Sequence, residues 1–232
     1  MPKVSSSILC ANFAILKDEI KRIENTDMIH IDVMDGVFVP NLTFGQKIIS
    51  PVKGILMELN LKILLDVHLM IINPHNHIKS FYEAGADIIT FHYEAYRNIE
   101  KCIDIIKDIK NFGIKAGIAI NPETYLPEYE IVRLLREGNP DILLIMGVHP
   151  GFSGQKFIPN VFDKIKKTRK IVDRINRSNL RKNSDIKIAV DGGIKMNNAA
   201  EIVKNGADIL TAGSEVFECN SCKIIEEFKK LK

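Results

Sequence analysis

The sequence predicts an α/β protein that folds as a closed (β/α)₈ barrel, or TIM barrel. Short aliphatic runs alternate with stretches of helical periodicity along the whole chain. Polar residues fall at the C-terminal ends of several runs, where barrel enzymes carry their functional groups. An open, doubly wound sheet is the alternative, but the first run lacks the Gly-rich dinucleotide fingerprint. With no linker or domain boundary apparent, residues 1–232 are expected to form a single catalytic barrel domain.

Eight aliphatic runs are expected to form the strands. In order they are VSSSIL (4–9), MIHIDVM (28–34), KILLDVHLM (62–70), DIITFH (87–92), KAGIAI (115–120), DILLIM (141–146), IKIAVD (186–191) and DILTA (208–212). Helical periodicity lies between them, for example over 98–112 and 160–178. Such alternation implies parallel strands joined by helical crossovers, and burial on both faces explains why the runs are almost purely aliphatic.

A faint internal repeat supports this arrangement. EAGADIIT (83–90), EGNPDILL (137–144) and KNGADILT (204–211) share one pattern. In each, a helix is expected to end at a glycine that takes the left-handed cap, and an Asp then opens the next strand. The polar segment SNLRKNSD (178–185) is expected to be a surface loop before the seventh strand.

Composition and charge exclude several classes of protein. A net charge of +3 is too small to indicate nucleic-acid binding, and no apolar run approaches the ~20 residues that span a bilayer. The basic segment 164–177 has apolar residues at helical spacing, so we interpret it as a solvated helix face. A strand begins almost at once, without a leader, and the four cysteines are scattered, although CNSC (219–222) matches a Cys-x-x-Cys pair. We therefore expect a soluble cytoplasmic protein.

The second run departs from the aliphatic rule. Ile29, Ile31 and Val33 alternate with His30, Asp32 and Met34, so a period of two places the latter three on one face. Polar groups and methionines end other runs too. They are Ser7, Asp66, His68, Met70, Met146, Asp191, Gly213 and Ser214. In a barrel, all of these converge on one rim.

His30, Asp32, His68 and Asp191 together suit a divalent cation: Zn²⁺ first, with Fe²⁺, Mn²⁺ or Co²⁺ as the other candidates. A single strand His or Asp is more often a hydrogen-bonded structural residue, but two carboxylates side by side need a cation or a proton for compensation. Asp66 lies deeper on the strand of His68 and is expected to support the ligands.

Glycine-rich turns follow the last three strands. HPGFSGQKF (149–157), DGGI (191–194) and AGSEVF (212–217) offer backbone N–H groups to an anion, and Ser214 is expected to cap a helix that begins near Glu215. Barrels often bind phosphate at the loops after their seventh and eighth strands. Met34, Met70 and Met146 are either core filler or an apolar cap over reacting atoms. His92 and His149 also lie near strand ends. For each of them the sequence allows two roles, contact with the substrate or support of the structure.

With these motifs assembled, the sequence closely resembles the ribulose-phosphate 3-epimerase family. The resemblance rests on SSSILCANFA, HIDVMDGVFVPNLTFG, DVHLM, HPGFSGQKF, VDGGI and AGSEVF, in order along nearly the whole chain. It implies a ribulose-phosphate-binding barrel that interconverts D-ribulose 5-phosphate and D-xylulose 5-phosphate in the pentose phosphate pathway. By the same resemblance His30, Asp32, His68 and Asp191 bind the metal, Asp32 and Asp191 are the acid/base pair, and the protein is a homo-oligomer.

The resemblance also implies the substrate contacts. Ser7 and His68 touch the sugar, while Met34, Met70 and Met146 cover the reacting face. The phosphate contacts are Gly151, Phe152, Ser153, Gly154, Gly192, Gly193, Gly213 and Ser214. One departure is Ser153, where the family usually has glycine. Alternatives are 3-epimerization of another ketose phosphate, such as a six-carbon one, a metal-dependent hydrolase and a non-catalytic sugar-phosphate binder.

Overall fold

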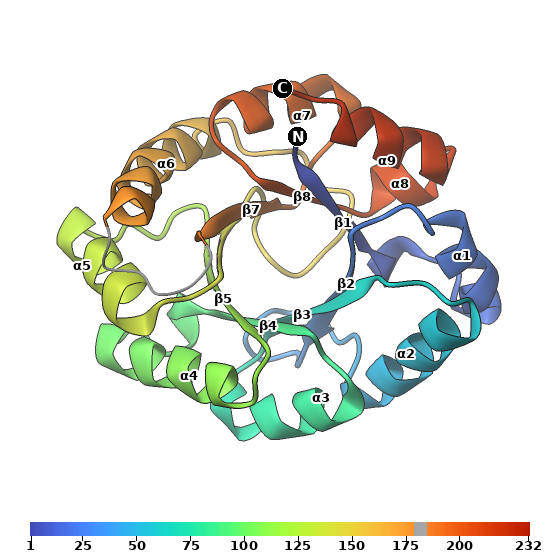
Figure 1. Cartoon of the computed structure of the whole chain (residues 1–232), viewed down its shortest axis with the longest axis horizontal. Helices are drawn as coiled ribbons and strands as arrows, with labels where there is room; N and C mark the ends of the chain where they lie inside the picture. The colour runs from blue at the N-terminus through green and yellow to red at the C-terminus, as the bar shows by residue number, and fades with distance from the viewer. Residues whose placement is uncertain (179–184) are drawn as a thin grey trace.

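The computed structural model describes residues 1–178 and 185–232 as a closed barrel of eight parallel strands, in the order β1 to β8 (Figure 1). The strands are β1 (Lys3–Ser7), β2 (Met28–Met34), β3 (Leu64–Met70), β4 (Ile88–His92), β5 (Lys115–Ile120), β6 (Ile142–Met146), β7 (Lys187–Asp191) and β8 (Ile209–Ala212). Each pairs with its neighbours in sequence, and β8 closes the sheet on β1. The predicted TIM barrel is therefore confirmed.

Helices form a ring around the barrel (Figure 1). They are α1 (Leu16–Arg22), α2 (Ile49–Glu58), α3 (Ile78–Ala84), α4 (Ile99–Asn111), α5 (Glu128–Arg133), α6 (Val161–Arg177), α7 (Met196–Lys204), α8 (Ser214–Phe217) and α9 (Ser221–Lys229). Short 3₁₀ turns lie at Ile8–Cys10, Phe13–Ile15, Gln46–Ile48, Pro74–Asn76 and Tyr93–Ala95, and a π-helical turn at Leu134–Gly138.

The predicted boundaries agree with the structure except at a few ends. The helix expected over 98–112 is α4, and Asn98 caps it by accepting a hydrogen bond from the Lys101 N–H. The first strand ends at Ser7 rather than at residue 9, because Ser7 caps a 3₁₀ turn there. The loop expected over 178–185 lies, for residues 179–184, outside the described residues.

Two apolar layers fill the fold. The larger one lies between the strands and the helices and includes Ile29, Ile31 and Val33, the outward side of β2. A smaller one fills the barrel interior with Met28, Ile142 and Leu144 among others. Because side chains alternate along a strand, the remaining inward positions of β2 and β3 are left for polar groups above this floor.

The faint internal repeat corresponds to a hydrogen bond that recurs around the barrel. Asp87, Asp141 and Asp208 each precede a strand, and each carboxylate accepts the N–H of the second residue of the preceding strand at 2.8–3.0 Å. Asp27 does the same for Val4 at 2.9 Å, a member that the sequence comparison missed. Each carboxylate also pairs with a Lys or Arg from a surrounding helix. These four aspartates tie neighbouring strands and helices together.

One part of the repeat was predicted wrongly. Gly85 and Gly206 take the left-handed conformation at the ends of their helices, with φ of 110° and 117°. In the third copy Gly138 does not; Asn139 has φ 53° instead. The π-helical turn adds a residue to this helix end, which moves the left-handed position onto an Asn, the non-glycine residue that tolerates it best.

We expect Asp141→Ala to lower the free energy of unfolding by about 1.5–3 kcal/mol, because a charge-assisted hydrogen bond to the Ala116 N–H is lost. Urea denaturation followed by circular dichroism measures this change. Asp104→Ala, at an exposed position on α4, is the control. A loss below about 0.5 kcal/mol, typical of surface sites, would contradict the structural role of Asp141.

The basic segment 164–177 lies in α6, whose buried side includes Ile165, Ile171, Val172 and Ile175. The interpretation as a helix with a packed apolar side is confirmed. Cys219 and Cys222 are free thiols, and the Cys222 Sγ–H donates to the Arg22 carbonyl. Among the described residues, no helix combines the length and the apolar character needed to cross a membrane.

Candidate active site

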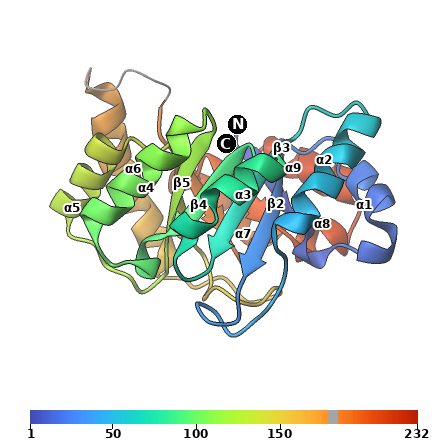
Figure 2. The same cartoon turned by 90° about the horizontal axis from the view of Figure 1, so that it is seen from below.

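The C-terminal ends of the strands meet at one end of the barrel. Figure 2 shows the loops after β2 and β6 extending from this end. These two loops are joined, since the Asn41 Nδ2–H donates to the Gly151 carbonyl at 2.8 Å. The loops also lie close together. A Cβ built on Gly151 would be 3.4 Å from the Val39 side chain and 3.6 Å from that of Pro40. The loop after β6 therefore lines a pocket over the barrel, and the loop after β2 supports it through these contacts.

Strand register brings the predicted polar residues together. Asp32 on β2 lies opposite His68 on β3, and His30 lies opposite Asp66. Asp191 ends β7 and faces the same interior from the other side of the barrel. Both imidazoles are fully buried, and Asp32 and Asp191 are exposed by only 5% and 8%. The four residues expected to bind a cation thus form one buried cluster beneath the pocket.

One atom of each residue points at a common centre. His30 Nε2 lies 3.2 Å from His68 Nδ1 and 3.3 Å from Asp32 Oδ1. His68 Nδ1 lies 3.2 Å from Asp32 Oδ1. Asp191 Oδ2 completes the group, 3.7 Å from His30 Nε2 and 3.5 Å from His68 Nδ1. All four atoms lie within 4.8 Å of one another.

These spacings fit a tetrahedral metal centre. Ligand atoms about 2.0–2.2 Å from a tetrahedral ion are separated from each other by roughly 3.3–3.6 Å. The five separations above, from 3.2 to 3.7 Å, lie within about 0.1 Å of that range, and the sixth, between the Asp32 and Asp191 oxygens, is no more than 4.8 Å. Two nitrogens and two carboxylate oxygens are also a donor set that borderline divalent ions accept. The cluster is therefore consistent with a metal site.

The charges of the cluster are strongly coupled. Burial disfavours a charged imidazole, but the Asp32 and Asp66 carboxylates outweigh it and hold the pKa of His30 well above its ordinary value. Burial also opposes charge on His68, whose pKa is nevertheless raised by hydrogen bonds to Asp191 and Asp32. Against its own burial, the pKa of Asp32 is lowered by His30 and His68. Without a cation, these shifts favour protonated imidazoles beside the carboxylates.

Cation binding should therefore release protons. A raised pKa means that an imidazole keeps its proton until the pH rises past that value, and a cation needs the unprotonated nitrogen. We expect the apparent affinity for Zn²⁺ to rise with pH across the neutral range, by about tenfold per pH unit for each proton displaced. Isothermal titration calorimetry in buffers of different ionisation enthalpy counts these protons. An affinity independent of pH would contradict this coupling.

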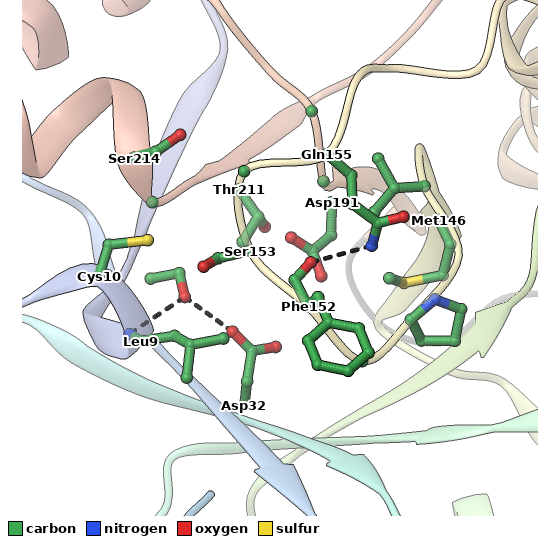
Figure 3. Close-up of a pocket in the computed structure, with 18 of the residues that line it drawn as sticks. Leu9, Cys10, Asp32, Met146, Phe152, Ser153, Gln155, Asp191, Thr211 and Ser214 are labelled. Carbon is green, nitrogen blue, oxygen red and sulfur yellow. Dashed lines mark hydrogen bonds between the residues drawn. The ribbon is translucent and has the colours of Figure 1, made fainter. Parts of the chain in front are cut away.

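Two further residues hold the cluster in place. The Ser7 hydroxyl donates to Asp32 Oδ2 at 2.7 Å, which directs Asp32 Oδ1 toward the imidazoles (Figure 3). Asp66 Oδ2 lies 2.8 Å from His30 Nδ1 and accepts a hydrogen bond from Ser5. Asp66 thus backs His30 on the side away from the centre, as the depth of Asp66 along β3 suggests. Its Oδ1 is buried without a hydrogen-bond partner.

The predicted substrate residues line the pocket, except for His68, which lies below it. Figure 3 shows Asp32 and Asp191 reaching into this pocket from opposite sides. Met34, Met70 and Met146 are buried and contribute their side chains to its wall. Met34 and Met70 pack with Val39 from the loop after β2, which gives the pocket an apolar lining beside the carboxylates.

The glycine-rich turns supply the opposite wall. Gly151 to Gly154, Gly192, Gly193, Gly213 and Ser214 all line the pocket. Gly192 and Gly193 have φ of 99° and 68°, and a Cβ on them would lie 2.4 Å from Val148 and 2.5 Å from the Phe157 N. These two positions require glycine for both conformation and space. Their backbone is left free to approach an anion closely.

Ser153 fits its turn without strain, since its φ is not positive. Burial raises the pKa of the Cys10 thiol, and a hydrogen bond with Ser153 opposes that shift. The prediction that Ser214 caps a helix was wrong. Ser214 is the first residue of α8, and Gly213 occupies the cap position. Glu215 points away from the pocket, because its carboxylate accepts the Met196 N–H at 3.0 Å and pairs with Lys195.

Sequence reasoning left several buried or pocket-lining groups without a role. His92, fully buried at the end of β4, contacts His68, and Glu94 contacts His92 in turn. Thr211 lines the pocket with a buried hydroxyl that has no hydrogen-bond partner. The signal for His92 was its place at a strand end on the inward face, but nothing marked Glu94. His149 is exposed, with Nε2 3.1 Å from Glu123, and belongs to the rim.

Comparison with known proteins places the chain in a family. The family model described as "Ribulose-phosphate 3 epimerase family" matches residues 3–217. The chain is 41% identical to ribulose-phosphate 3-epimerase of Bacillus subtilis (strain 168) over 232 residues, 99% of either chain. It is 37% identical to the enzyme of the same name from Escherichia coli (strain K12), covering 97% of this chain and 94% of the other.

Solved structures agree on the fold. The barrel superposes on 3-hexulose-6-phosphate synthase from Salmonella typhimurium with a TM-score of 0.65 at 19% identity, covering 98% of this chain and 97% of the other. At that identity the likeness shows the shared barrel alone. The relatives and the family model span nearly the whole chain, and this chain belongs to the ribulose-phosphate 3-epimerase family.

Proposed function

We propose that the protein interconverts D-ribulose 5-phosphate and D-xylulose 5-phosphate by inverting carbon 3. The main support for the proposal is that two buried carboxylates, Asp32 and Asp191, line the same pocket. Glycine-rich turns line that pocket as well. The relatives that share this chain's full length bear the name of that activity. A phosphorylated ketose has the three features that this pocket meets: an acidic C–H, a diol-like oxygen pair and an anionic end.

Inversion of a carbon centre needs a base on one face and an acid on the other. Asp32 comes from β2 and Asp191 from β7, so the two carboxylates approach a substrate from different sides. One removes the carbon 3 proton to give an enediolate, and the other returns a proton to the opposite face.

Each carboxylate has two oxygens for two tasks. Asp32 directs Oδ1 at the cluster, while Oδ2 is bonded to the Ser7 hydroxyl at the edge of the pocket. Asp191 likewise turns Oδ2 toward His30 and His68. His30, Asp32, His68 and Asp191 would hold a divalent cation, with Zn²⁺ the first candidate, and the bound ion would supply Lewis-acid stabilisation of the negative charge that develops on the substrate. Ser7, which lines the pocket, then positions the sugar, whereas His68, predicted to touch the sugar, lies below the pocket with both ring nitrogens engaged.

The remaining pocket residues bind the ends of the substrate. The backbone of the glycine-rich turns and Ser214 receives the phosphate, with Phe152 and Ser153 at the rim. Met34, Met70 and Met146 cover the reacting carbon with polarizable groups that carry no acidic proton, so the carbanion is protected from stray protonation. We further propose that residues 1–232 act as one catalytic domain, in the cytoplasm and as a homo-oligomer.

Proton NMR in D₂O tests the reaction. Purified protein is incubated with D-ribulose 5-phosphate before and after removal of metal with a chelator. We expect D-xylulose 5-phosphate carrying deuterium at carbon 3, no product after chelation, and recovery on addition of Zn²⁺. Conversion of a six-carbon ketose phosphate in preference to the pentulose, or hydrolysis of the phosphate ester, would contradict the proposal. Folded, Zn²⁺-loaded protein that exchanges no deuterium would contradict it as well.

A further inference from the structure

A second histidine stands behind His68. His68 uses Nδ1 for the cluster, and its other nitrogen, Nε2, lies 2.8 Å from His92 Nε2. The ring centroids are 4.9 Å apart, and the ring planes differ by only 18°. The centroid separation exceeds the nitrogen separation by about one ring width, so the rings meet edge to edge in a common plane. This is the geometry of a ring N–H donating to a ring nitrogen.

A carboxylate stands behind His92 in turn. Glu94 Oε2 lies 3.2 Å from His92 Nδ1, and Glu94 Oε1 accepts the Asn121 N–H at 2.8 Å. The side chain of His92 is fully buried and that of Glu94 is 6% exposed. The Phe38 ring, from the loop after β2, covers His92 with a centroid separation of 5.0 Å. The chain His68–His92–Glu94 is therefore shielded from water.

The hydrogen atoms along this chain follow from its ends. Glu94 already accepts a backbone N–H through one oxygen, and as an ionised carboxylate it has no proton to donate. The proton of neutral His92 must then lie on Nδ1, which leaves Nε2 as an acceptor. His68 must in consequence carry its proton on Nε2. The proton that a cation displaces from His68 is then the one on Nδ1, and the lone pair left there points at His30, Asp32 and Asp191.

The loop that carries Asn121 is itself held. The half-buried Lys164 ammonium donates to the carbonyls of Asn121, Pro122 and Thr124. This anchors the turn after β5 and so the N–H that orients Glu94. Each imidazole of the cluster is thus backed by a carboxylate: His30 directly by Asp66, and His68 through His92 by Glu94.

We propose that His92 and Glu94 are positioning residues that hold His68 in the tautomer with its lone pair on Nδ1, ready to bind the cation. The inference rests on the proposed metal-dependent function and extends it to two residues outside the cluster. Neither residue lines the pocket. Outer groups of this kind typically change metal affinity by about 10–100-fold when removed.

Zinc affinity of the full-length protein, measured by competition with a chromophoric chelator, tests the proposal without substrate. His92→Leu removes the acceptor, and we expect about 10–100-fold weaker Zn²⁺ binding. His92→Gln can accept the His68 N–H through its side-chain carbonyl and should restore most of the affinity. In Glu94→Gln the amide oxygen accepts the Asn121 N–H and the NH₂ faces His92 Nδ1, which favours the wrong tautomer, so affinity should fall. His75→Leu, at an exposed histidine, is the matched control.

The tautomer itself is read in the wild-type protein, so the test does not depend on variants that fold. Long-range ¹H–¹⁵N correlation of the Zn²⁺-loaded protein should show the His68 proton on Nε2 and the His92 proton on Nδ1. A His92 proton on Nε2, or a folded His92→Leu protein with unchanged Zn²⁺ affinity, would overturn the proposal. Failure to epimerize ribulose 5-phosphate, with these zinc results intact, would count against the proposed function alone.

Discussion

Asp32→Asn and Asp191→Asn should each reduce epimerization of D-ribulose 5-phosphate by about 10²–10⁴-fold, the usual contribution of a general acid or base. An amide can neither remove the carbon 3 proton nor return one. Each substitution also removes a charged oxygen from the cluster, where Asp32 Oδ1 and Asp191 Oδ2 lie within 4.8 Å of both imidazole nitrogens. The loss should therefore fall toward the upper end of this range. Initial rates from a coupled assay for xylulose 5-phosphate measure it.

The fold should survive both substitutions. Asparagine has nearly the same shape as aspartate, and the barrel's apolar layers do not include these residues. Circular dichroism and urea denaturation check this point. Asp141→Asn, which removes a partly buried carboxylate at the opposite end of β6, is the matched control and should retain wild-type turnover. Near wild-type turnover in Asp32→Asn or Asp191→Asn would refute the mechanism with two carboxylates.

Gly193→Ala should lower kcat/KM by about 10²-fold, the scale expected when a substrate is misplaced by about 1 Å. Gly193 has φ 68°, and a Cβ there would lie 2.5 Å from the Phe157 N and 2.8 Å from its Cα. These are backbone atoms, which cannot move aside as a flexible side chain can. The turn after β7 must therefore shift, and with it the N–H groups proposed to receive the phosphate.

Backbone strain alone must be separated from this displacement. Gly113 has a similar φ of 78°, but nothing lies within 4 Å of a Cβ built on it. Gly113→Ala therefore carries the cost of a left-handed alanine, about 1–2 kcal/mol, without a collision and outside the pocket. Its kcat/KM should equal that of the wild type. The inhibition constant of inorganic phosphate should rise in Gly193→Ala only, and unchanged phosphate inhibition in that variant would contradict the assignment of this turn.

The fold was predictable because its signals are local. A parallel barrel buries both faces of each strand, so a run such as 142–146 is visible as an uninterrupted apolar segment. A helix that packs one side on a barrel keeps a 3.6-residue period, as α6 does. The errors occurred at ends. Asn139 in place of Gly138, and Ser214 inside α8 instead of before it, depend on single backbone angles that neighbouring contacts decide.

The candidate site was predictable in its members but not in its geometry. Alternation placed His30, Asp32 and His68 on inward faces, because side-chain direction on a strand follows from residue parity alone. The distances among them depend on the register between β2 and β3 and on the closure that brings β7 across the barrel. Neither can be read from one chain. The match to a tetrahedral centre therefore came only from the structure.

By itself, the sequence determined the barrel, the rim that carries the chemistry and the residue types gathered there, since these depend on period and composition. Only the tertiary structure decided which atoms face the centre and what supports them. His92 and Glu94 show the reason. Their roles arise from contacts across β3, β4 and the turn after β5, between residues as far apart as His68 and Asn121. A hydrogen bond between distant segments leaves no local pattern, because its partners are neighbours only after the chain has folded.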